Sequence, residues 1–223
     1  TRQVFAATVV NTANMNGWAF QVLSPDGSGT FVNGPGTAPL GNGSARLFTG
    51  TQGSLATAIH NSGFAGTAVS NITNLDYSTY AVSIANGEKY PVILIDVTTD
   101  FGTDVVRFDP ENQSTTPVLH TWQTWNAESG IWNSSIFPGF TGGTLSDYVT
   151  FVSGFSAPPT IVNRGNGTGG VRTEIGPGST PEVFDGNVDY FTIGILGADT
   201  TYDFEPDAPA ADSDKDGLTD AFE

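Results

Sequence analysis

The sequence predicts an all-β domain, a jelly-roll β-sandwich with one short helix and a C-terminal calcium-loop segment. Short runs rich in Val, Ile, Thr, Tyr and Phe recur along the 223 residues. Gly, Pro, Asn and Asp separate these runs, and one segment has helical periodicity. Many short strands with such turns are typical of sandwiches and jelly rolls. A chain of this length can bury a core within one domain.

Twelve segments have the β-branched and aromatic content that suits a pleated, half-buried surface. The predicted strands are 3–11, 17–23, 45–49, 54–60, 76–84, 90–98, 104–108, 118–126, 160–163, 171–175, 187–196 and 200–204. The segment 187–196 alternates. A period of two places Val188 and Tyr190 on one face of that strand, and Phe191 and Ile193 on the other.

The segment 144–152 is predicted to be the helix. Its apolar residues follow i, i+3, i+4, i+7 spacing; they are Leu145, Tyr148, Val149 and Val152. Thr144 is suited to the N-cap, and Asp147 three residues later gives a short version of the capping box. The β-prone run Tyr-Val-Thr-Phe-Val leaves a strand as the alternative.

The composition changes after Pro206. Residues 207–211 contain Pro and Ala but little that can pack, which is typical of a linker. Residues 212–223 read Asp-Ser-Asp-Lys-Asp-Gly-Leu-Thr-Asp-Ala-Phe-Glu. We therefore divide the chain into a sandwich over 1–206, a linker over 207–211 and a terminal motif over 212–223.

The terminal motif has the spacing of an EF-hand-like calcium loop. Such a loop places oxygen ligands at alternating positions, and its sixth residue must turn sharply, as Gly217 can. The predicted ligands are Asp212, Asp214, Asp216, the Leu218 carbonyl, Asp220 and a bidentate Glu223. The sequence thus predicts calcium as the cofactor, with a solvated acidic tail as the alternative.

This loop resembles the calcium repeats of thrombospondin type 3 regions, and the related repeats of bacterial exoproteins and dockerins. The resemblance covers twelve residues, 212–223. Because those repeats come in series, it implies that further Asp-rich repeats follow residue 223. Flanking helices are not evident in the sequence, which disfavours an intracellular EF-hand protein.

Motifs spread over 17–206 carry a second resemblance. They include Pro-Leu-Gly-Asn-Gly-Ser-Ala-Arg-Leu at 39–47, Trp-Gln-Thr-Trp-Asn-Ala at 122–127, Gly-Asn-Val-Asp-Tyr-Phe-Thr-Ile-Gly at 186–194 and Thr-Tyr-Asp-Phe-Glu-Pro at 201–206. These motifs resemble secreted bacterial sandwich domains of the concanavalin-like or carbohydrate-binding-module type. The resemblance implies a jelly roll outside the cell or on its surface. By analogy it implies binding of a polysaccharide or surface glycan.

Charge and cysteine content exclude several classes of function. The net charge is −16 and only seven residues are Lys or Arg, so the basic footprint of a nucleic-acid binder is missing. The same charge opposes binding to anionic membranes, and the sequence has no membrane-length apolar run. The absence of cysteine excludes disulfides and thiol chemistry.

Three tryptophans are candidates for glycan binding, because aromatic rings stack on the apolar faces of sugars. They are Trp122, Trp125 and Trp132. Core packing is the alternative, since large aromatic side chains are mostly buried. In addition, an odd spacing directs Trp122 and Trp125 to opposite faces of a strand.

Two further sets of residues are candidate sites. Asp96, Asp100 and Asp104 flank a short turn and are candidates for a second metal site. The alternative is a hairpin turn in which Asp100 and Gly102 supply the turn chemistry. Five Asn-x-Ser/Thr sequons are candidate glycosylation sites; they begin at Asn42, Asn71, Asn112, Asn133 and Asn166.

The sequence favours a binding module over an enzyme. It contains no Gly-x-Ser-x-Gly elbow. Its glutamates lie in no acidic strand motif that indicates the paired carboxylates of a glycoside hydrolase. The alternative to a glycan-binding or adhesive module is a structural subunit of a surface layer or extracellular filament. Such a subunit self-associates, for example through the predicted first strand.

Overall fold

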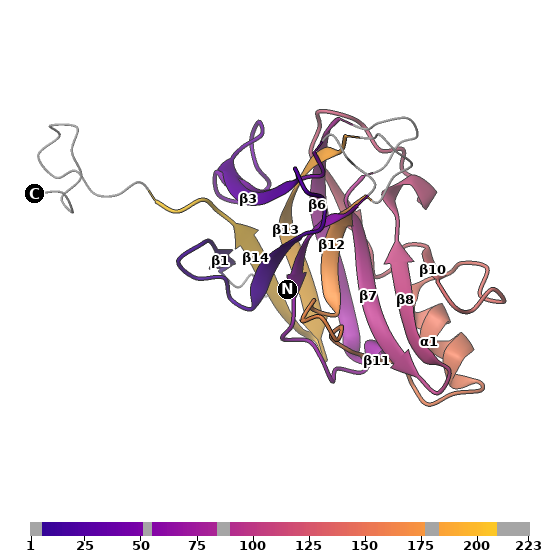
Figure 1. Cartoon of the computed structure of the whole chain (residues 1–223). Helices are drawn as coiled ribbons and strands as arrows, with labels where there is room; N and C mark the ends of the chain where they lie inside the picture. Colours follow the sequence, from indigo (N-terminus) through magenta and orange to yellow (C-terminus); the bar gives the residue numbers. More distant parts are fainter. Residues whose placement is uncertain (1–5, 51–54, 84–89, 177–182, 209–223) are drawn as a thin grey trace, which may run out of the picture.

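The described part of the chain forms a sandwich of two seven-stranded sheets, which confirms the predicted fold class (Figure 1). The computed structural model describes residues 6–50, 55–83, 90–176 and 183–208. The calcium loop and most of the linker lie outside these residues. Within them, no helix is long and apolar enough to span a membrane.

The first sheet, sheet A, is organised around its longest central strands. Its members are β1 (Thr8–Val10), β14 (Ala198–Phe204), β13 (Asp185–Ile195), β4 (Gly43–Phe48), β3 (Ser28–Asn33), β6 (Ile72–Ser83) and β9 (Gln123–Asn126). β6 runs along one side of β13, while β4 and β14 share the other side. All pairs are antiparallel except β1 with β14.

The second sheet, sheet B, faces sheet A across the core. Its members in order are β10 (Trp132–Ser134), β8 (Gly102–Phe108), β7 (Val92–Thr99), β12 (Val171–Ile175), β5 (Thr57–Asn61) and β2 (Trp18–Val22), with β11 (Thr160–Ile161) paired to β7. Trp18 packs edge-on against Phe191 and Phe204 of sheet A, with centroids 4.9 and 5.1 Å apart. Such pairs join the two layers.

Each of the twelve predicted strands overlaps an observed strand, and β3 and β10 are strands that the sequence did not predict. β3 carries the turn formers Gly29 and Asn33. It is extended because its whole length pairs with β4. β10 is three residues long and pairs with the edge of β8. In both cases the neighbouring strand overrides a weak local preference.

The predicted alternation of β13 is wrong, because this strand contains a β-bulge. Between Asp189 and Thr192 the strand carries one residue more than its partner β6, and Tyr190 has a φ of 53°. The bulge changes the face on which successive residues lie. As a result, Val188 and Phe191 are both buried in the core, although strict alternation places them on opposite faces.

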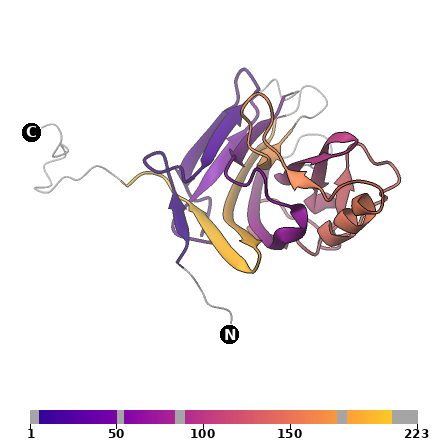
Figure 2. The same cartoon turned by 90° about the horizontal axis from the view of Figure 1, so that it is seen from below.

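The predicted helix is confirmed as α1 (Leu145–Ser153). Thr144 Oγ1 accepts a hydrogen bond from Asp147 N at 3.1 Å, and Asp147 Oδ2 accepts one from Thr144 N at 2.9 Å. This is the predicted capping box. α1 lies at the opposite end of the molecule from β1 and β14, as both views show (Figure 1, Figure 2). Two short 3₁₀ turns, η1 (Val69–Asn71) and η2 (Pro110–Asn112), complete the described elements.

Candidate functional site

Two of the three candidate tryptophans are core residues. Trp125 and Trp132 are buried, and their indole Nε1 atoms donate to Thr79 Oγ1 at 2.9 Å and to the Ala127 carbonyl at 2.7 Å. A ring without an exposed face cannot stack on a sugar. The prediction that these two residues bind a glycan is therefore corrected in favour of core packing, the alternative that the spacing allowed.

Trp122 is half-buried and remains a candidate. It lies just before β9, where its Nε1 donates to the Pro35 carbonyl at 2.8 Å. Its ring lies 5.5 Å from that of Tyr80, which in turn lies 6.2 Å from the ring of His120. In β6, Tyr80 lies an odd number of residues from the buried Tyr77 and Ala81, so its side chain points to the opposite face of the strand. This aromatic group therefore lies on the outer side of sheet A.

The three candidate metal aspartates do not form a metal site. Asp96 is buried and paired with arginines, and Asp104 is buried among hydroxyl and backbone donors. Asp100 lies in the exposed turn and accepts from Ala157 N at 2.9 Å. No cluster of three or more metal-ligating side chains occurs in the ranges that the structure describes. The hairpin turn, the alternative, is what the structure shows between β7 and β8.

A groove on the outer face of sheet B is the candidate functional site. It has a volume of about 310 Å³ and crosses β12, β7, β8 and β10, which lie side by side in Figure 1. Its lining residues are Leu94, Val105, Arg107, Asn133, Ser134, Ser135, Arg164, Arg172 and Glu174. Strand alternation explains this lining, because the neighbours of Arg107 and Arg172 along their strands are all buried.

A network of ion pairs lies in and beneath the groove. Asp96 Oδ2 is 3.0 Å from Arg164 Nε and also pairs with Arg172, whose Nε is 3.0 Å from Glu174 Oε2. Arg107 pairs with Asp109 at 2.6 Å. Burial is the main cause that raises the pKa of Glu174, and the charge of Arg172 opposes this rise.

The loop between β11 and β12 forms one wall of the groove. It supplies Arg164, and it is held down where Gly169 N donates to His60 Nδ1 at 2.9 Å and Gln21 Nε2 donates to Thr168 Oγ1. Burial, and secondly the charge of Arg172, lower the pKa of His60. The loop therefore covers β2 and β5 and leaves the groove open over the remaining strands.

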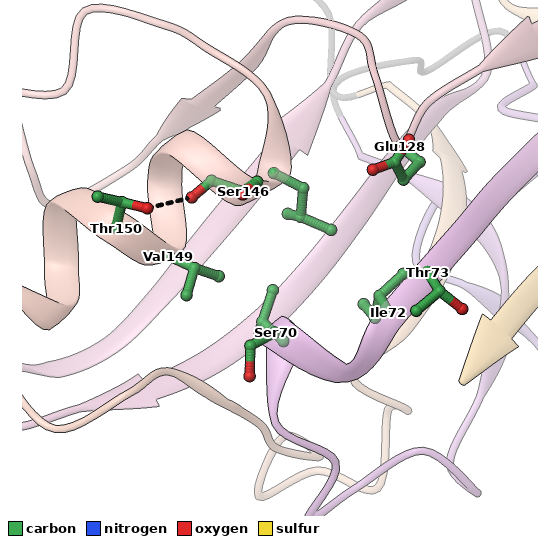
Figure 3. A pocket seen from close by; sticks show the side chains of 9 residues that line it. Ser70, Ile72, Thr73, Glu128, Ser146, Val149 and Thr150 are labelled. Carbon is green, nitrogen blue, oxygen red and sulfur yellow. Dashed lines mark hydrogen bonds between the residues drawn. The ribbon is translucent and has the colours of Figure 1, made fainter. Parts of the chain in front are cut away.

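A second hollow of about 320 Å³ lies between α1 and η1 (Figure 3). Ser146, Val149 and Thr150 of the helix face it from one side, and Glu128 lies across from them. Thr150 Oγ1 donates a hydrogen bond to the Ser146 carbonyl at 2.9 Å. Among the described residues that line each of them, the hollow has the carboxylate of Glu128 and the groove has that of Glu174.

The candidate glycosylation sites differ in position. Asn42, Asn112 and Asn166 are exposed, while Asn71 in η1 is half-buried. Asn133 is also half-buried and lines the groove of sheet B. A glycan attached to Asn133 would therefore fill the candidate site.

The groove arginines were missed by the sequence analysis, which used the scarcity of basic residues only to exclude functions. The sequence signal that could have revealed them is the run Val105-Val106-Arg107-Phe108. A charged residue between two apolar residues of a strand lies on the face opposite to the core. The same holds for Arg172 and Glu174 in β12.

No protein-family model matches this chain, and neither does any curated protein sequence. Its structure is similar to a crystal structure of a family 30 carbohydrate-binding module, with a TM-score of 0.43 and 17% sequence identity. The match covers 85% of this chain and 83% of that chain. The fold described above rests on the strand pairing within this chain.

Proposed function

We propose that this domain is an extracellular glycan-binding module and that the groove on sheet B is its binding site. The observation that carries the proposal is the composition of the groove. Leu94 and Val105 give it apolar surface, and side chains with several hydrogen-bonding groups surround them, among them Asn133 and Arg107. A site with apolar surface and a few placed polar groups is the usual form of a small-ligand pocket.

A glycan array probed with the full chain, with calcium and with chelator, tests this proposal. Val105→Trp fills the groove without removing an ion pair, and Val149→Trp, also at a half-buried position, fills the hollow of Figure 3. We expect a saturable glycan signal that Val105→Trp abolishes and that Val149→Trp leaves intact. Trp122→Ala tests the aromatic surface of sheet A.

Absence of any glycan signal contradicts the proposed function. Loss of the signal in Val149→Trp or Trp122→Ala alone moves the site to the hollow or to the outer side of sheet A. Thermal unfolding of each variant shows whether its fold is intact.

We also propose that residues 212–223 bind calcium. The support is the match of Asp212, Asp214, Asp216, Leu218, Asp220 and Glu223 to the ligand positions of a calcium loop. Calorimetric titration of the full chain should show one calcium ion bound. Asp216→Ala combined with Glu223→Gln should abolish binding, and an unchanged titration contradicts the site.

A self-associating structural subunit is the second candidate function. A pair of exposed aromatic side chains favours it, Phe101 and Phe155, whose rings lie 5.6 Å apart at the end of the sandwich that carries α1. Exposed apolar patches commonly mark interaction surfaces. Sedimentation velocity should show a concentration-dependent oligomer that Phe101→Ser together with Phe155→Ser dissociates. A monomer at high concentration contradicts this function.

A further inference from the structure

We infer that the groove on sheet B recognises an acidic glycan, one whose sugar units carry carboxylate groups, through Arg107 and Arg164. This inference rests on the proposed glycan-binding function and names the class of glycan. Its support comes from where the cationic side chains lie, which of their atoms are used, and what the groove lacks.

The groove concentrates cationic residues in a chain that has few. The chain has seven Lys and Arg residues and a net charge of −16, yet Arg107, Arg164 and Arg172 all line this groove. An acidic ligand is repelled by most of such a surface. Arg172 is only 1% exposed, but Arg107 and Arg164 are accessible, so the groove is a place where an acidic ligand meets opposite charge at close range.

The most exposed charged side chains in and beneath the groove are those of Arg107 and Arg164, while Glu174, the carboxylate that lines the groove, is 13% exposed and pairs with Arg172. The side chains of Arg107 and Arg164 are 39% and 37% exposed, whereas those of their partners Asp109 and Asp96 are 9% and 0% exposed. In an ordinary surface ion pair both charges meet water. Here the guanidinium groups are the exposed members of their pairs, and the buried aspartates hold them in place.

Each of these two arginines keeps one edge available. Arg107 and Arg164 donate to their aspartates through Nε and Nη2. Their Nη1 atoms donate to no acceptor among the described residues. A guanidinium has five N–H groups in a planar fork and can bind a second carboxylate through the edge formed by Nη1 and Nη2. Bidentate pairs of this kind are strong and directional.

The groove lacks the features that would favour a neutral glycan. No aromatic ring is among its described lining residues, so it offers no stacking platform. Affinity must then come from hydrogen bonds and charge, and bonds to an ionised ligand group are stronger than bonds to a hydroxyl. Val105, which is half-buried, remains available for the apolar face of a sugar ring.

Oligomers of polygalacturonate and the same oligomers after methyl esterification test this inference. The pair differs in charge and shares its sugar backbone. Calorimetry on the full chain in chelator excludes bridging by calcium. We expect the free acid to bind at least about tenfold more tightly than the ester, and affinity to weaken as salt rises.

Arginine variants identify the groups responsible. Arg107→Gln and Arg164→Gln should each weaken binding of the free acid by about tenfold. Arg46→Gln is the matched control, because Arg46 pairs with Asp185 through the same two atoms, is 39% exposed, and lies on sheet A. This control should leave affinity unchanged.

The outcomes separate this inference from the proposed function. Equal binding of acid and ester overturns the acidic specificity and leaves glycan binding in place. The same holds if neither oligomer binds while a neutral glycan binds and Val105→Trp abolishes its binding. If no glycan of any kind binds, both proposals fall. The comparison of acid with ester uses the unchanged chain, so it stands even where an arginine variant unfolds.

Discussion

Two buried aspartates, one on each sheet, have different surroundings. Asp96 on sheet B is fully buried and contacts two guanidinium groups, those of Arg164 and Arg172. Asp189 on sheet A is also fully buried, but its carboxylate accepts from the backbone N–H groups of Leu40 and Phe204, at 2.9 and 3.1 Å. One carboxylate has cations beside it, and the other has backbone dipoles.

Burial without a neighbouring cation makes sheet A sensitive to pH. Burial raises the pKa of Asp189 to about 7, and its backbone hydrogen bonds oppose only part of this rise. Burial, and then the charge of Glu205, raise the pKa of Asp203 to about 6. Backbone donors therefore satisfy the geometry of a buried acid without compensating its charge as a guanidinium does.

The acids of sheet A also explain two of the sequence motifs. Glu205, in the motif at 201–206, accepts from Asn42 N at 2.6 Å and Gly43 N at 3.1 Å, in the motif at 39–47. Gly41 has a φ of +50°, and a Cβ there would lie 1.5 Å from Glu205 Oε1. These motifs therefore form one structural unit, remote from the groove, in which a glycine-rich loop encloses acidic side chains.

Removing the cation beside Asp96 should have the largest effect on stability. Arg172→Met leaves Asp96 buried with one arginine partner, and it removes the arginine that pairs with Glu174. We expect a loss of about 3–5 kcal/mol in the free energy of unfolding, measured by urea denaturation. Arg46→Met, which breaks a partly exposed pair with Asp185, should cost about 0–1 kcal/mol. Equal losses would mean that burial does not distinguish these pairs.

The sequence predicts the features that depend on neighbouring residues, and it does not predict those that depend on pairing between distant strands. The capping box of α1 lies within four residues, so its pattern is visible and its prediction was confirmed. The strands are also visible, because alternation and β-branched content are local. The groove is not visible, because Arg107 and Arg172 meet only through the pairing of β8, β7 and β12. The bulge at Tyr190 likewise depends on its partner strand.

The acids of sheet A should make the domain more stable in mild acid. An aspartate in an unfolded chain has a pKa of about 3.9. Between that value and about pH 7, folded Asp189 retains a proton that the unfolded chain has released. This contribution to stability is complete below about pH 4 and is lost as pH rises through 7. The melting temperature should therefore fall from pH 5 to pH 8.

Asp189→Asn isolates this contribution. The variant should flatten the pH dependence of the melting temperature relative to the unchanged chain. His60 acts in the opposite direction, since its lowered pKa favours the folded state as pH rises toward about 6.5. The difference between the two proteins removes the contribution of His60. An identical slope in both would exclude Asp189 as the source.

Asp104 is a third kind of buried acid, because neutral side chains surround it. The smallest expected effect on stability is the difference between a tyrosine that donates to this acid and one that donates to a carbonyl. Tyr148 Oη donates to Asp104 Oδ2 at 2.8 Å, while the equally buried Tyr77 Oη donates to the Pro91 carbonyl at 2.7 Å. A hydrogen bond to a charged acceptor contributes about 1.5–3 kcal/mol and one to a neutral acceptor about 0.5–1.5 kcal/mol. Tyr148→Phe should therefore cost more stability than Tyr77→Phe in urea unfolding.

The two variants remove the same atom from buried tyrosines, so their difference reports the charge of the acceptor rather than the volume lost. The donors that remain on Asp104 are the hydroxyls of Ser134 and Ser135 and two backbone N–H groups. If Tyr77→Phe costs as much as Tyr148→Phe, those donors already satisfy Asp104. The Tyr148 hydroxyl would then add little to the stability of Asp104, and dipoles of the remaining donors would be sufficient for its burial, as backbone dipoles are for Asp189.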